Sequence, residues 1–123
     1  MKTLHIDELP LQPLRIPEGW CVDYNQFFDV EPGADVRLLG SASDDVWQLF
    51  GEDMLLLSHG RHGYQVDMGW YPDSDPSGRF RIRLVHGDEW DRPIMEFETS
   101  DKREAVRYLE EILKEGAKAS ISY

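Results

Sequence analysis

Alternating apolar and polar positions in the second half of the chain predict three β-strands. Apolar side chains occupy every second position in 64–70, 80–84 and 95–99, with mostly polar residues between them. A period of two is typical of strands that have one buried and one solvated face. The connecting segments 72–78 and 87–92 are rich in Asp, Pro and Gly, which favours hairpin loops. We therefore expect an antiparallel meander.

The first half predicts shorter strands, and the end of the chain predicts a helix. The shorter candidate strands are 19–24, 36–39, 46–50 and 54–57. Between 101 and 115, apolar residues recur at helical spacing, and Asp101 with Glu104 matches a capping box. We expect this helix to cover the inner face of the sheet.

The domain organisation follows from these elements and from three prolines. Pro10, Pro13 and Pro17 predict that residues 1–18 form an extended arm rather than a helix. We expect one domain over 1–123, made of this arm, a sheet in 19–99 and the helix in 101–115. The fold class is α+β, with a mainly antiparallel sheet of about five or six strands and the C-terminal helix packed on one face.

A row of arginines on the expected meander is matched by acidic residues on the neighbouring strands. In one register that keeps the apolar faces together, Asp67 and Glu96 lie on either side of Arg83, and Glu98 lies beside Arg81. Opposite charges across a ladder stabilise it by about 0.2–1 kcal/mol per pair. We therefore interpret the row as neutralised within the sheet, not as a nucleic-acid footprint.

The overall charge changes the picture of possible partners. The chain has 24 acidic and 13 basic residues, a net charge of −11, and residues 1–75 hold 14 of the acids against 4 bases. This balance argues against direct binding to nucleic acid or to an anionic membrane, and it favours a basic protein partner. Because 41% of the residues are hydrophobic, the chain is expected to fold.

The N-terminal residues lack the basic and then apolar pattern of a secretion signal, and the longest apolar run, 54–57, is too short to span a bilayer. A cytoplasmic location is expected. Cys21 stands alone, which excludes an internal disulfide, and we expect its side chain to be buried.

Two motifs suggest metal chemistry but are incomplete. Residues 73–78 match the start of a calcium loop, yet the twelfth position is Leu84, where a bidentate Glu is needed. His59 and His62 are spaced so that they could share a metal or provide a general base, but no third ligand is marked. We expect a solvated loop there and predict no catalytic residue, no metal and no cofactor.

Acidic residues gather around aromatic residues in several loops and suggest a surface for a basic protein. Aromatic anchors surrounded by acids suit protein recognition, with charge steering the encounter. The candidate partner-binding residues are Asp44, Asp45, Glu52, Asp53, Trp70, Tyr71, Asp73, Asp75, Asp88, Glu89, Trp90 and Asp91.

Several diffuse motifs resemble small immunity proteins of bacterial polymorphic toxin systems, the kind paired with contact-dependent growth-inhibition toxins. They are Ile16–Trp20, Tyr24-Asn25, Asp67–Pro72, Gly78, Trp90, Pro93 and Phe97–Thr99. The resemblance implies a cytoplasmic protein, not an enzyme, that binds one cognate toxin domain and blocks it. Such toxins are often basic nucleases, and we expect a monomer in a 1:1 complex.

Two alternatives to an inhibitor remain open from the sequence. One is a small metal-assisted or acid/base enzyme that uses the His59/His62 loop. The other is a cytosolic adaptor or ligand-binding domain without a toxin.

Overall fold

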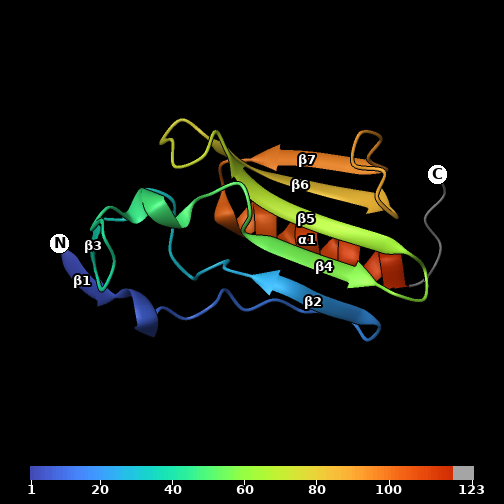
Figure 1. Ribbon diagram of the computed structural model, residues 1–123, viewed down its shortest axis with the longest axis horizontal. Helices are drawn as coiled ribbons and strands as arrows, with labels where there is room; N and C mark the ends of the chain where they lie inside the picture. The colour runs from blue at the N-terminus through green and yellow to red at the C-terminus, as the bar shows by residue number, and fades with distance from the viewer. Residues whose placement is uncertain (118–123) are drawn as a thin grey trace.

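The computed structural model describes residues 1–117 and shows a five-stranded antiparallel sheet with helix α1 packed on one face (Figure 1). The strand order is β2–β4–β5–β6–β7. The elements are β2 (Trp20–Asn25), β4 (Leu55–His59), β5 (Tyr64–Tyr71), β6 (Arg79–His86), β7 (Met95–Thr99) and α1 (Lys102–Ala117). This arrangement confirms the predicted α+β class; residues 118–123 of the predicted domain lie outside the described residues.

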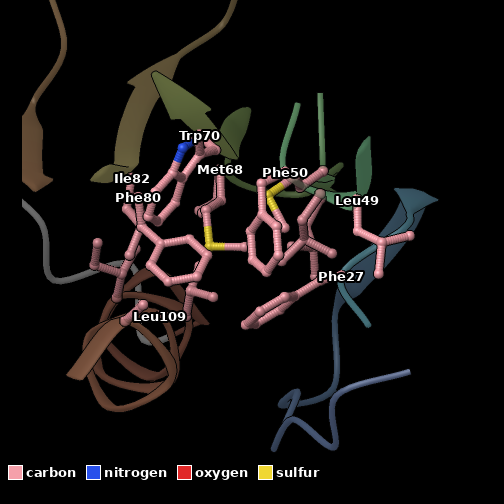
Figure 2. Close-up of a cluster of buried hydrophobic side chains, with 14 of the residues drawn as sticks. Phe27, Leu49, Phe50, Met68, Trp70, Phe80, Ile82 and Leu109 are labelled. Atoms are coloured by element: carbon pink, nitrogen blue, oxygen red, sulfur yellow. The ribbon is translucent and has the colours of Figure 1, made fainter. Parts of the chain in front are cut away.

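The inner face of the sheet and the apolar side of α1 enclose the core. Met68 and Phe80 point to this side and are fully buried, as is Leu109 on the helix. Figure 2 shows these three side chains together with Phe50 and Phe27, which extend the core beyond the sheet. Complete burial of one such side chain stabilises the fold by about 1.5–3 kcal/mol.

Helix α1 begins after the predicted N-cap Asp101, but the capping box with Glu104 is only half formed, because the Asp101 N–H donates to Thr99 Oγ1 at 3.1 Å. The Asp101 carboxylate accepts hydrogen bonds from the backbone N–H groups of Arg103 and Glu104, at 2.9 and 3.3 Å. These two groups have no partner within the helix, so the cap satisfies them. None of the helices among the described residues is long and apolar enough to cross a membrane.

The N-terminal arm is more regular than predicted. Strand β1 (Lys2–His5) pairs in parallel with β3 (Val36–Leu39) to form a second small sheet, and a short 3₁₀ turn η1 (Ile6–Glu8) follows. The expectation of an extended arm over 1–18 is therefore wrong for η1, whereas β1 is extended as expected but pairs in a sheet. The proline constraint applies only from Pro10 onward, which leaves the preceding residues free to pair.

One buried lysine ties the arm to the helix. The Lys102 side chain is 7% exposed, and its ammonium donates to Gln12 Oε1 and Asp29 Oδ1 at 2.6 and 2.5 Å. Gln12 belongs to the arm and Asp29 to the segment after β2. A buried ammonium without these partners would be strongly destabilising.

The predicted strand 46–50 is instead the 3₁₀ helix η2 (Val46–Leu49). Asp45 caps it, because its carboxylate accepts a hydrogen bond from the Trp47 N–H at 3.0 Å. Val46 and Leu49 are both buried and lie three residues apart, which matches the three-residue turn of a 3₁₀ helix. A short apolar run cannot distinguish the two structures by its composition alone.

The register of the meander agrees with the prediction. Asp67 lies opposite Arg83, Arg83 lies opposite Glu96, and Arg81 lies opposite Glu98. All five side chains therefore belong to the face of the sheet that α1 does not cover. We call this the outer face.

Strand β2 carries a bulge that changes which way its residues point. The pairing with β4 shifts between Val22 and Tyr24, so that Asp23 is an extra residue. Before the bulge, Trp20 faces α1 and its indole N–H donates to the Leu113 carbonyl at 2.9 Å. After it, Tyr24 lies opposite Leu56 on the outer face.

Candidate functional site

Asp67 lies at the middle of the outer face, on the central strand β5. Its neighbours across the ladder are Leu56 on β4 and Arg83 on β6. The carboxylate accepts a hydrogen bond from Arg83 Nη2 at 3.1 Å, and only 14% of the Asp67 side chain and 17% of the Arg83 side chain are exposed. The outer face therefore holds a largely buried ion pair.

An irregular segment before β4 brings a second carboxylate to the same place. The Trp70 N–H donates to the Gly51 carbonyl at 2.7 Å, and the Met54 N–H donates to the Met68 carbonyl at 3.0 Å. The residues between these two bonds are Glu52 and Asp53, which bulge over the outer face.

Gly69 makes this bulge possible. A Cβ atom at this position would overlap the Glu52 carbonyl oxygen, so any larger residue would push the segment away from the strand. A glycine inside a strand commonly marks such a close approach of two backbones. The missing side chain thus helps to set the position of Asp53.

Asp53 and Asp67 line two adjoining hollows, which we together call the outer-face hollow. One has a volume of about 340 Å³ and the other about 240 Å³, and both are bounded by Asp53, Leu56 and Asp67. The remaining lining residues are Tyr24 and Leu55 in the larger part and Tyr71, Arg83 and Trp90 in the smaller part. Apolar, aromatic and charged groups meet there, as in many binding sites.

Burial raises the pKa of the Asp67 carboxyl above its usual range, and the nearby charge of Asp53 raises it further. The hydrogen bond and the positive charge of Arg83 act in the opposite direction but do not cancel the effect of burial. Burial and the charge of Asp67 also raise the pKa of Tyr71. An ionisable group in a hollow whose pKa is shifted by burial and by neighbouring charges is a frequent sign of a functional site.

Aromatic rings contact two arginines of the row, Arg81 and Arg83. The Arg81 guanidinium lies 4.6 Å from the centre of the Tyr71 ring, and that of Arg83 lies 5.6 Å from the centre of the Trp90 ring. Both Nε atoms are buried and lack a hydrogen-bond partner among the described residues. These cation–π contacts keep the guanidinium groups on the surface of the sheet.

The neutralisation predicted for the arginine row is therefore only partly ionic. Asp67 forms the expected pair with Arg83. Within residues 1–117, neither Glu96 nor Glu98 forms an ion pair with the arginine opposite it. The aromatic rings supply contacts that the charge pattern did not predict.

The predicted partner-binding residues fall into separate places. The outer-face hollow is lined by Asp53, Tyr71 and Trp90. Glu52 lies beside it, because the Tyr71 hydroxyl donates a hydrogen bond to the Glu52 backbone carbonyl at 3.3 Å. Asp88 lies near the same face, because it accepts a hydrogen bond from Gln65 on β5 at 3.2 Å.

The other predicted residues are not brought to this hollow. Asp44 pairs with Arg37 at 3.4 Å beside the small sheet, and Asp45 caps η2. Asp73 accepts a hydrogen bond from the Ser74 hydroxyl within the same hairpin loop. The backbone N–H and the hydroxyl of Ser77 donate to Asp75 at 2.8 and 2.7 Å, and both hydrogen bonds lower the pKa of Asp75. Glu89 and Asp91 are exposed in the 87–92 loop, where Glu89 lies 3.9 Å from Arg92.

The structure removes Trp70 from the candidate set. This residue is 1% exposed, lies in the core in Figure 2, and donates its indole N–H to the Asp75 carbonyl at 2.8 Å. It alternates with Tyr71 along β5, so only one of the two can face outward.

The expectation for Cys21 is also wrong, because the residue is exposed. It lies opposite Ser58 on the outer face, on the outermost strand β2. The helix covers only the other side of the sheet at this position.

His59 and His62 do not form the solvated loop that was predicted. Their rings stack at 4.5 Å, the Trp20 ring meets His59 edge-on at 5.2 Å, and His59 is 4% exposed. Burial and the neighbouring His62 lower the pKa of His59. Among the described residues, no group of three His, Cys, Asp or Glu side chains is arranged to hold a metal.

Sequence reasoning missed Tyr24, Leu56 and Asp67 as site residues. Asp67 was assigned only to the neutralised row, and Tyr24 reaches the outer face only because of the bulge in β2. The available signal was Gly69, a glycine within an otherwise regular strand pattern.

The comparisons with known proteins add no relative: no family model, no curated protein and no solved structure matches this chain.

Proposed function

We propose that this protein is a stoichiometric inhibitor that binds a basic toxin protein, as immunity proteins of bacterial polymorphic toxin systems do. The observation that carries the proposal is the outer-face hollow, in which Asp53 and Asp67 lie among aromatic side chains on the open side of the sheet. Asp67 is the more buried of the two, and its burial disfavours the charged form of the carboxyl group. A cationic group from a partner would offset this effect.

The rest of the surface favours the same class of partner. The net charge of −11 attracts a basic protein over a distance and repels nucleic acid. The aromatic rings of Tyr24, Tyr71 and Trp90 provide apolar contact area beside the carboxylates, a combination common at binding hot spots.

The mechanism of inhibition is coverage of a basic surface on the toxin. If the toxin is a nuclease, its basic cleft normally receives phosphates, and the acidic outer face would take their place. The inhibitor would act in the cytoplasm as a monomer in a 1:1 complex, without a cofactor.

A charge introduced into the outer-face hollow tests this function. Leu56→Arg places a cation of the protein's own between Asp53 and Asp67, so we expect it to weaken toxin binding at least tenfold, or about 1.4 kcal/mol. The measurement is titration of the purified toxin domain encoded beside the gene, together with protection of cells that express it.

Leu39→Arg is the matched control, because Leu39 is an exposed leucine on the small sheet, outside the hollow. It should bind and protect like the natural protein. If Leu56→Arg binds as well as Leu39→Arg, the outer face is not the interface. If the natural protein neither binds nor protects, the inhibitor function itself is wrong.

A further inference from the structure

We infer that the outer-face hollow is a receptor for a single arginine side chain of the partner, whose guanidinium lies between Asp53 and Asp67 and against the ring of Tyr24. The inference rests on the proposed function and deepens it, because it names the group that is recognised.

The charges in the hollow leave room for one cation. Asp67 uses Oδ2 for its contact with Arg83. Asp53 has neither a hydrogen bond nor an ion pair with any described residue. Among the residues that line the hollow, two carboxylates therefore face one guanidinium, and this excess of negative charge is complementary to one added positive charge.

The walls favour a guanidinium over an ammonium group. Tyr24 and Leu56 line the larger part of the hollow and offer apolar surface to a flat, weakly hydrated cation. Two carboxylates from different segments can each accept hydrogen bonds from the five donors of one guanidinium. A lysine ammonium is a compact and strongly hydrated charge, so it would lose more hydration for the same contacts.

The same face already binds guanidinium groups in this way. Arg81 lies over Tyr71, and Arg83 lies over Trp90 while it pairs with Asp67. An incoming arginine beside Tyr24 would repeat this combination of a ring and a carboxylate. The precedent is within the molecule and involves adjoining residues.

The hollow is built into the sheet, so an arginine would enter a formed site. Leu56 and Asp67 are cross-strand neighbours, and the close backbone approach at Gly69 sets the position of Asp53. A site that exists before binding avoids the entropic cost of ordering loops.

The first test uses the blocked peptide acetyl-Gly-Arg-Gly-amide at millimolar concentrations, with the isotope-labelled protein observed by NMR. We expect saturable shifts of the Tyr24, Leu56 and Asp67 amides. The same peptide with lysine should bind several-fold more weakly, and the uncharged citrulline peptide should cause no saturable shift. Equal binding of the lysine peptide, shifts from citrulline, or no saturable shift in the hollow would overturn the inference.

Variants separate this site from general attraction to an acidic protein. Asp53→Asn and Asp67→Asn should each weaken binding of the arginine peptide at least fivefold. Asp35→Asn removes the same charge from an exposed position outside the hollow and should leave binding unchanged. Native-like NMR spectra of all three variants would exclude unfolding as the cause of weaker binding. If Asp35→Asn weakens binding as much as the other two, net charge alone explains the effect and the site is refuted.

The pH dependence of binding, compared between variants, gives a second readout for Asp67. The groups acting on Asp67 are Arg83, Asp53 and Arg81, and burial keeps its pKa raised. Peptide affinity should therefore increase with pH as Asp67 ionises, and the increase should be smaller in Asp67→Asn than in Asp35→Asn, which keeps Asp67. Toxin inhibition without peptide binding would refute this inference alone, whereas peptide binding without toxin inhibition would refute only the proposed function.

Discussion

At the scale of single residues, Gly69 sets the geometry of the site because it has no Cβ atom. A Cβ at this position meets the Glu52 backbone, whereas a Cβ at Gly60 has no heavy atom within 4 Å. We expect Gly69→Ala to lower the free energy of unfolding by about 2–4 kcal/mol, because backbone must move to relieve the overlap. Urea denaturation measures this loss.

Gly60→Ala is the matched control and should change the free energy of unfolding by less than about 0.5 kcal/mol. The displaced segment carries Asp53, so Gly69→Ala should also weaken binding at the hollow. A Gly69→Ala protein as stable as Gly60→Ala would show that the bulge adapts without cost.

Part of the site could be predicted from residue types alone. The combination of acids with neighbouring aromatics predicts Asp53, Tyr71 and Trp90 as contacts for a basic partner, and all three line the hollow. Trp70 met the same criterion but points inward. Composition cannot decide between adjacent residues of a strand, because the side of the sheet is set by pairing.

At the scale of elements, the turn of the β4–β5 hairpin contacts β2 through histidine rings. The stacked rings of His59 and His62 lie beneath Trp20, and the charge of Arg61 also acts on His59. The pKa of His59 is lowered in the fold, so the unfolded chain takes up its proton first as the pH falls below about 6.5. This contact should therefore lose stability progressively on acidification.

We expect the free energy of unfolding to fall between about pH 7.5 and pH 5, and the fall to be smaller in His59→Asn, which does not titrate. Urea denaturation at both pH values gives the comparison. Asp67, whose pKa is raised, acts in the opposite direction in both proteins, so the difference between them isolates His59. An identical fall in the two proteins would contradict the assignment.

The elements themselves were predictable where a pattern is long. The meander and α1 follow from periods of two and of about three to four residues sustained over several turns or pairs. Short segments were not predictable: η2 has only four residues, mostly apolar, and this composition is equally compatible with a strand. The bulges at Asp23 and at Glu52–Asp53 depend on pairing between distant segments, which periodicity does not contain.

At the scale of the whole molecule, the net charge of −11 should govern the rate of association with a basic toxin. Long-range attraction between exposed charges is screened within about 10 Å at 0.1 M salt. We expect the association rate constant to fall at least about tenfold between 50 and 500 mM salt, with a smaller change in the dissociation rate constant. Stopped-flow or surface-based kinetics measures both constants, and an association rate that does not respond to salt would contradict steering.

The two edge strands of the five-stranded sheet, β2 and β7, carry features that hinder pairing with the edge of another sheet. Strand β2 is kinked by the extra residue Asp23, and β7 presents Glu96 and Glu98 along its length. A kinked edge disrupts the regular spacing of hydrogen bonds that an added strand needs, and repeated carboxylates repel an identical edge. These edges thereby discourage ribbon-like self-association and aggregation, while the open outer face stays free to recognise a different molecule.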